Sequence, residues 1–177
     1  MLNRRLSKIR YDERHAIDTS IETLQLLDIL IVCISTMFRI DLSVRQILRL
    51  GVFLRTRGDK VDFVKLDQWL SQLHLQRAAQ LQGSILMVAM GFEQDELPFV
   101  TRQEPAAMRL LAYSLRHSTG EYEEWRIEDN KPVFIRSNSR ALFRSLRRCV
   151  RYAPYAPLES MSHLLGGMAK SISEIDE

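Results

Sequence analysis

The stretch from Leu24 to Phe38 reads LQLLDILIVCISTMF, and it decides the fold. Its larger apolar residues recur at spacings of three and four, which is the period of an α-helix. They are Leu24, Leu27, Leu30, Ile31, Ile34, Met37 and Phe38, and Val32 and Cys33 fill the other side. A helix that is apolar almost all round is normally central in a helical core. Because polar residues interrupt the run and it is too short to span a bilayer, we expect a buried helix.

The residues just before this helix have the form of a capping box. Thr19 is the expected N-cap, and Glu22 stands three positions later, where its carboxylate can return to the backbone. Residues 1–18 are polar and basic and are expected to form an arm, followed by a helical domain over residues 19–177. The basic start is not followed directly by an apolar stretch, so it does not resemble a signal peptide.

The same helical period continues through the rest of the chain. Further helices are expected to begin at Asp41 or Ser43 and end at Gly58, to begin at Asp62, to run over about 75–90 and close at Gly91, to begin at Pro105, and to cover about 139–152 and 158–172. Residues 118–135 are rich in Glu and Asp, which indicates an exposed acidic loop with a short strand at 133–135.

Length and composition agree with this interpretation. The chain has 177 residues, which favours one domain, and only 7 Gly and 5 Pro, which argues against a loop-rich or all-β protein. We therefore predict an all-α, single-domain bundle of about seven helices. The two cysteines, Cys33 and Cys149, are expected to be reduced, as is usual in a cytoplasmic protein.

One predicted helix carries an unusual charge pattern. Six arginines fall within the 16 residues from 136 to 151, which contain no acid: Arg136, Arg140, Arg144, Arg147, Arg148 and Arg151. From Arg140 onward their spacing places them on one helical face, and Leu142, Phe143, Leu146 and Val150 are expected to pack on the protein from the other. Guanidinium groups suit phosphate oxygens, so this face is a candidate surface for nucleic acid, polyphosphate, anionic lipid or an acidic partner. The alternative is a solvated face paired with the acidic loop.

Catalytic patterns are weak or missing in the sequence. The four histidines are far apart, and no zinc, P-loop or G-x-S-x-G pattern is present, so we expect no metal site and no cofactor. Gly83-Ser84 followed by Glu93 and Asp95 imitates a nucleotidyltransferase motif, in which a glycine turn holds a triphosphate and paired carboxylates hold magnesium. Here the Gly-Ser pair lies within a helical period instead of on a turn after a strand. We therefore predict no catalytic residue in this segment.

The segment LSVRQIL, residues 42–48, resembles the G-hydrophobic-G-L-R-Q segment of a family of bacterial uncharacterised nucleotidyltransferases. The similarity continues through residues 50–54 and 61–66, the Leu97-Pro98-Phe99 link, Gly120 and the arginine-rich helix. The resemblance implies the helical half that follows the catalytic domain in that family. Two departures stand out: Arg49 replaces the family's usual Asp, and the helix before the Arg-Gln pair lacks its histidines.

Three functions follow as hypotheses. The first is a non-catalytic helical module that docks on a protein partner, including one that carries a nucleotidyltransferase core, with Arg45 or the arginine-rich helix facing that partner. The second is binding of phosphate or nucleic acid through residues 136–151. The third is part of a nucleotidyltransferase whose catalytic half is missing, because an 18-residue arm is too short for the catalytic sheet.

Overall fold

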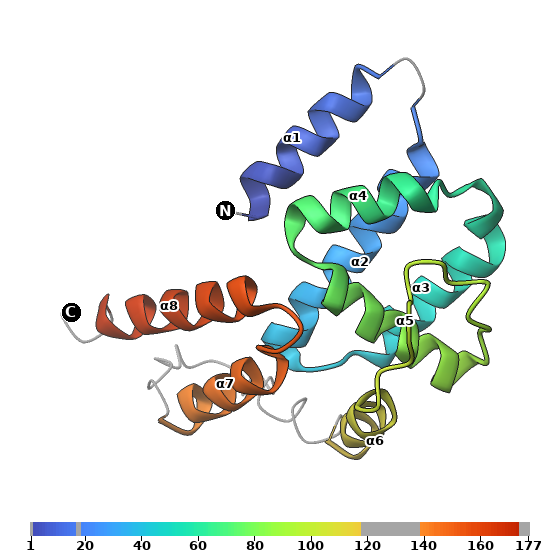
Figure 1. Ribbon diagram of the computed structural model, residues 1–177. Coiled ribbons are helices and arrows are strands. Elements are labelled where there is room, and N and C mark those ends of the chain that lie inside the picture. The colour runs from blue at the N-terminus through green and yellow to red at the C-terminus, as the bar shows by residue number, and fades with distance from the viewer. Residues whose placement is uncertain (1, 17–18, 118–138, 174–177) are drawn as a thin grey trace, which may run out of the picture.

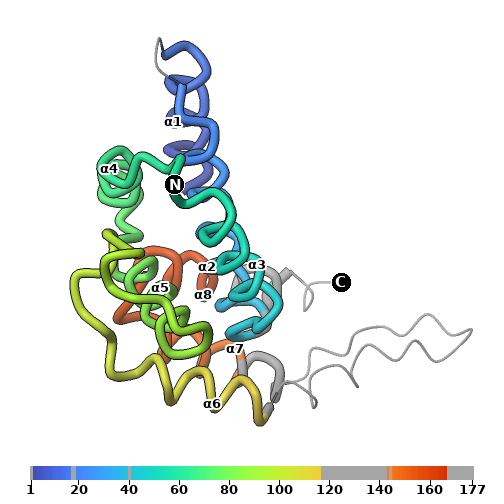
Figure 2. Tube along the Cα trace, turned by 90° about the vertical axis from the view of Figure 1, so that its right-hand side faces the viewer, coloured from blue at the N-terminus to red at the C-terminus, as the bar shows by residue number. Residues whose placement is uncertain are grey.

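The computed structural model describes residues 2–16, 19–117 and 139–173, and within these ranges the chain is all-α, as predicted. The elements are α1 (Leu2–Arg14), α2 (Ile21–Ile40), α3 (Val44–Arg57), the 3-10 turn η1 (Gly58–Lys60), α4 (Phe63–Leu73), α5 (Gln76–Met90), α6 (Ala107–His117), α7 (Ser139–Tyr152) and α8 (Pro157–Ser173). The helices form one bundle, in which α1 lies at one end and α6 and α7 at the other (Figures 1 and 2). The predicted acidic loop and short strand at 118–135 lie outside the described residues.

Helix α2 runs through the middle of the bundle, as its apolar pattern predicts (Figure 1). It packs against α3, α4, α5 and α7, which together cover most of its apolar side chains. Leu26, Leu27 and Leu30 are completely buried, and Ile34 and Met37 are nearly so. Burial of each such side chain stabilises the fold by about 1.5–3 kcal/mol, which makes α2 the main contributor to the core.

Helix α2 extends beyond the Leu24–Phe38 run at both ends, so the expectation that this helix is too short to span a bilayer is wrong. By length and composition alone it could cross a membrane. The segment Ile21–Arg39 has a mean hydropathy of 1.8, and it is the one such segment in the described part of the chain. Half of the segment is buried within the bundle. The core helix of a soluble protein passes the same test of length and composition, so this feature by itself gives no clear membrane span.

The start of the chain differs from the expected arm. Within residues 1–18, Leu2–Arg14 form helix α1, which packs against α4 and buries Leu6 and Ile9. Its last turn is held by a buried ion pair, in which Lys65 of α4 donates to the Glu13 carboxylate at 2.8 Å. Glu13 also accepts from the backbone N–H of Ser20 at 2.5 Å. Leu2, Leu6, Ile9 and Glu13 recur at helical spacing, which explains why this basic stretch folds onto the bundle and raises the number of described helices to eight.

Helix ends follow the sequence signals in part. The Asp62 carboxylate caps α4 by accepting from the Lys65 N–H at 2.9 Å, and Gly91 closes α5 in the left-handed conformation with φ of 66°. The capping box at Thr19 is not formed. Ser20 is the N-cap of α2 and has no side-chain cap, and the Thr19 hydroxyl donates instead to the Ala16 carbonyl. The Thr19 hydroxyl is therefore already bonded within the turn between α1 and α2 and does not cap α2.

Gly83 and Ser84, which imitate a nucleotidyltransferase motif in the sequence, have a packing role in the structure. Gly83 lies inside α5, and a Cβ built there would lie 2.2 Å from Cγ2 of Val100 and 3.1 Å from Cε2 of Phe99. Ser84 Oγ accepts from the Glu104 N–H at 2.9 Å and donates to the Gln80 carbonyl. The pair thus lets the 99–104 segment lie directly on α5, and neither residue is on a turn.

We predict opposite effects for two glycine substitutions. Gly83→Ala gains helix propensity but forces a methyl group into the buried, β-branched Val100, and it should lower the free energy of unfolding by about 1–2 kcal/mol. Gly58→Ala is the matched control, since Gly58 has ordinary helical dihedral angles and nothing lies within 4 Å of its added Cβ. It should leave stability unchanged or raise it by up to about 1 kcal/mol. Urea denaturation followed by circular dichroism measures both, and equal effects would contradict this account of α5.

Candidate functional site

The predicted arginine-rich helix forms with the expected bounds, as α7 (Ser139–Tyr152). Its arginines do not share one environment. Arg147 is exposed, whereas Arg148 and Arg151 are partly buried. Arg136 and the side chains of Arg140 and Arg144 lie outside the described residues. The described part of the predicted stripe is therefore divided between the surface and the interior.

Arg151 is held inside the protein by a carboxylate. Its Nη1 donates to Oδ2 of Asp41 at 2.6 Å, and its guanidinium lies 3.9 Å from the centre of the Tyr113 ring. The hydroxyl of Tyr152 donates to the other oxygen of Asp41, which also accepts from the Leu42 N–H. Burial, reinforced by the Asp41 carboxylate, raises the pKa of Tyr152 far above its usual range, so this hydroxyl stays protonated and donates. Asp41 thus joins the α2–α3 turn to the end of α7.

These contacts fix the rotation of α7 and overturn the predicted orientation of its apolar side. Tyr152 and Cys149 are buried, and Tyr152 packs edge-on against Phe38 of α2. The opposite side therefore faces outward and exposes 66% of Phe143, 45% of Leu146 and 64% of Val150. The prediction that these three residues pack on the protein is wrong. The side chain of Leu142, the fourth member of that predicted row, lies outside the described residues.

Arg45 lies on a different helix, in the first turn of α3. It is exposed, as is Arg49 one turn later. Helix α3 packs mainly against α2 and α5, whereas α7 packs mainly against α2 and α8. The structure therefore does not bring the predicted site residues together into one described cluster.

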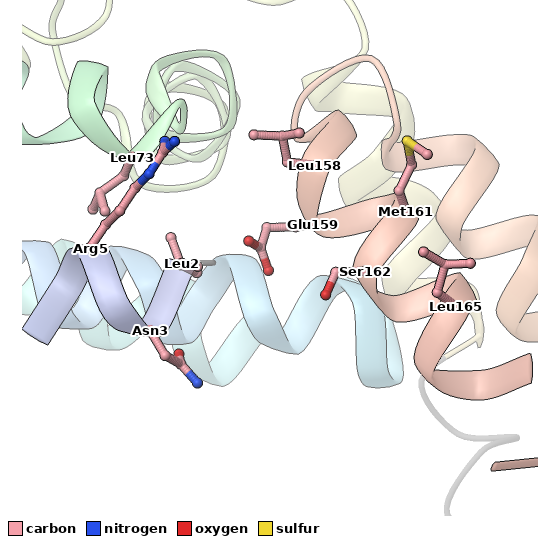
Figure 3. Close-up of a pocket in the computed structure, with 9 residues that line it drawn as sticks. All are labelled: Leu2, Asn3, Arg5, Leu73, Leu158, Glu159, Met161, Ser162 and Leu165. Atoms are coloured by element: carbon pink, nitrogen blue, oxygen red, sulfur yellow. The ribbon is translucent and has the colours of Figure 1, made fainter. Parts of the chain in front are cut away.

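A groove that was not predicted from the sequence lies between α1 and α8, beside the end of α4 (Figure 3). Its volume is about 360 Å³, and its lining residues are Leu2, Asn3, Arg5, Leu73, Leu158, Glu159, Met161, Ser162 and Leu165. The α8 wall is a row at positions i, i+3 and i+7, in which Leu158, Met161 and Leu165 expose 52%, 61% and 62%. That spacing was readable in the sequence, but the facing wall comes from α1, which was expected to be an arm.

The groove also carries two charged groups. Arg5 projects from α1 and donates from Nη1 to the Gln72 carbonyl at 3.0 Å, which holds it at the end of α4. Glu159 lies in the first turn of α8 and is partly buried. No ion pair links these two residues in the described structure. An apolar row with one cation and one carboxylate beside it is chemistry suited to binding, because it offers contact area and orienting polar groups together.

Chemistry-bearing residues elsewhere are dispersed. In the described ranges, no group of three or more His, Cys, Asp or Glu side chains could hold a metal ion. Glu93 and Asp95 are exposed in the loop after α5. In this loop the backbone N–H of Glu93 donates to the carboxylate of Glu96 at 2.8 Å. The two cysteines are free and buried, as predicted. The Cys33 thiol approaches the Gln46 carbonyl at 3.6 Å.

Comparisons with protein-family models, with curated proteins and with solved structures give no match to this chain. The resemblance to the nucleotidyltransferase family therefore stays a prediction based on the residues quoted above.

Two arginine substitutions on α7 should separate the inner from the outer residues. Arg151→Ala removes the cation from Asp41 and the stacking on Tyr113, and it should lower the free energy of unfolding by about 2–3 kcal/mol. Arg147→Ala, on an exposed side chain of the same helix, should change it by less than about 0.5 kcal/mol. Urea titration of both variants gives the comparison. Equal stabilities would mean that Asp41 does not anchor α7.

The buried thiols give a prediction of chemical reactivity. Burial raises the pKa of Cys33 from 9.0 to about 12, although Arg49 nearby lowers it in part, and burial also raises the pKa of Cys149. Since the thiolate is the nucleophile, both thiols at pH 8 should react with a disulfide reagent at least about a hundredfold more slowly in the folded protein than in urea. Stability should also fall as pH rises above 9, where only the unfolded chain ionises Cys33. Val32→Cys, at an exposed neighbour, is the control and should react at once.

Proposed function

We propose that this chain is a helical docking module that binds an amphipathic helix of a partner protein in the groove between α1 and α8. The observation that carries the proposal is the row of Leu158, Met161 and Leu165, each more than half exposed. A second helix presents apolar residues at the same i, i+3 and i+7 spacing, so it can match this row along two turns.

The size of the groove sets the expected strength of binding. Covering the exposed half of each of the three α8 side chains contributes about 1 kcal/mol per side chain to the free energy of binding. The entropy lost when the partner helix becomes ordered opposes this gain. Contacts with Leu2 and Leu73 must add to it, and so must the charged rim. Arg5 and Glu159 favour a partner helix with an acid and a base beside its apolar face. We therefore expect a weak, reversible complex.

The resemblance supplies a candidate partner. In the family that this chain resembles, the helical half follows a catalytic domain. A separate protein that carries such a nucleotidyltransferase core is therefore a candidate partner. In the alternative arrangement, both parts belong to one enzyme. Nucleotidyl transfer by this chain alone is not part of the proposal. We place the chain in the cytoplasm, a choice supported by its two free, buried cysteines.

Binding of phosphate or nucleic acid through α7 is the second candidate. It is supported by the exposure of Arg147 and, on α3, of Arg45 and Arg49. It is weakened by Arg151, whose charge is already paired with Asp41. Because two of the described α7 arginines face inward, fewer cations are presented than the sequence pattern predicted.

Site-specific photocrosslinking in the source cells tests the groove. A photoreactive phenylalanine analogue replaces Met161 in the groove, and Val64 on α4, which is 72% exposed, is the matched control position. We expect position 161 to crosslink to one protein and position 64 to give no such product. Leu165→Asp in the same chain should reduce the yield at least about tenfold, since it places a charge in the apolar row.

Peptide mapping of the crosslinked product then identifies the partner segment. A product at a helix with an i, i+3, i+7 apolar face supports the proposal, and its protein tells whether a nucleotidyltransferase core is involved. Equal crosslinking at positions 161 and 64, or a yield that Leu165→Asp does not change, would reject docking in the groove. Crosslinks to nucleic acid from position 161 would also reject it.

A further inference from the structure

The outward face of α7 is a second exposed apolar surface, separate in sequence and lining from the groove. It consists of Phe143, Leu146 and Val150, again at positions i, i+3 and i+7, with the exposed Arg147 between the last two. We refer to these four residues as the α7 face. None of them lines the groove between α1 and α8. The face therefore needs an explanation of its own.

The charge of α7 restricts what can cover this face. The helix has five arginines and no acidic residue in 14 positions. Arg147 directly follows Leu146 and precedes Val150 by three residues, so its guanidinium lies beside the apolar row. A surface that covers the row must therefore be apolar where it meets Phe143 and Val150 and anionic where it meets Arg147. A second copy of α7 fits poorly, because it would bring arginines against arginines.

The shape of the α7 face points to the kind of surface it binds. The three apolar side chains project from one convex helix, whereas the groove on α8 is concave. An exposed helix that has a row of large apolar residues with Arg147 beside it, and no acid in its sequence, has the chemistry of helices that lie in the interface of a bilayer. There the apolar side chains enter the acyl region and the guanidinium group reaches lipid phosphates.

We propose that the α7 face binds the surface of a membrane that contains anionic lipid. Phe143 and Val150 insert between the lipids, and Arg147 pairs with their phosphate groups. The pairing of Arg151 with Asp41 supports the same arrangement, because it holds α7 against α2 with the apolar row turned outward. This interaction does not depend on the groove or on the function proposed for it.

Vesicle sedimentation with the full chain tests the proposal. The probes are vesicles of phosphatidylcholine alone and of phosphatidylcholine with about one third phosphatidylglycerol. We expect binding to the mixed vesicles, at least about fivefold weaker binding to the neutral ones, and weakening by salt. The double variant Phe143→Ser/Val150→Ser should lose binding at least about tenfold, because both apolar anchors are removed. Arg147→Gln should weaken binding to the mixed vesicles by about fivefold and leave the neutral vesicles unaffected.

Two control variants make the result specific. Val64→Ser removes an equally exposed apolar side chain on α4 and should not change binding. Leu165→Asp, which disables the groove, should also leave vesicle binding unchanged, so the two proposals fail independently. Thermal unfolding of every variant should match that of the parent, since the replaced side chains are exposed.

Four results would overturn the proposal. They are no binding to mixed vesicles, equal binding to both kinds of vesicle, an unchanged affinity in the Phe143→Ser/Val150→Ser variant, and tighter binding to duplex DNA or polyphosphate that this variant leaves intact. The last result would assign α7 to nucleic acid or phosphate, because such a ligand needs the arginines and not the apolar row.

Discussion

The carboxylate of Asp41 determines which face of α7 points outward. It binds Arg151 and Tyr152 from consecutive positions of α7 and lies in the turn between α2 and α3. Asp41 has φ of 80°, a backbone conformation that favours glycine. For any other residue such a conformation costs about 1–3 kcal/mol. The ion pair and two hydrogen bonds offset that strain. Because consecutive residues of a helix point about 100° apart, tying two of them to one carboxylate leaves α7 a single rotation.

A second buried carboxylate has the same effect at the other end of the molecule. Glu13 joins α1 to α4 through Lys65 and to the start of α2 through the Ser20 N–H. Without this contact, α1 would be held mainly by Leu6, Ile9 and the exposed pair between Arg10 and Asp28. Helix α1 forms one wall of the groove, so the ion pair helps to hold that wall in place (Figure 3). Each of the two helices concerned, α1 and α7, is thus tied to the bundle by a carboxylate contact between residues distant in sequence.

The contacts of Asp41 change the interpretation of the arginine-rich helix. An amphipathic pattern has an apolar side and a charged side, and burial of the apolar side is the usual outcome. In α7 the end of the helix is tied down by Arg151, Tyr152 and Cys149, and the apolar row at 143, 146 and 150 is left outside. The exposed surface is therefore an apolar row with Arg147 beside it, and it is not the continuous stripe of arginines that the sequence pattern predicted. Together with the groove on α8, it gives this helical protein two separate exposed apolar surfaces.

The sequence by itself determined the class of fold, the central position of α2, and most helix ends. These depend on local periods and on single residues such as Asp62 and Gly91, which act on neighbouring backbone groups. It did not determine that α1 is a packed helix, that Gly83 marks a close approach of Val100, or which face of α7 points outward. The first depends on Glu13 meeting Lys65, 52 residues later, and the third on Asp41 meeting Arg151, 110 residues later. The second depends on the 99–104 segment returning to α5. Only the tertiary structure decides such pairings, because helical periodicity gives the two faces of a helix but not the direction in which either face points.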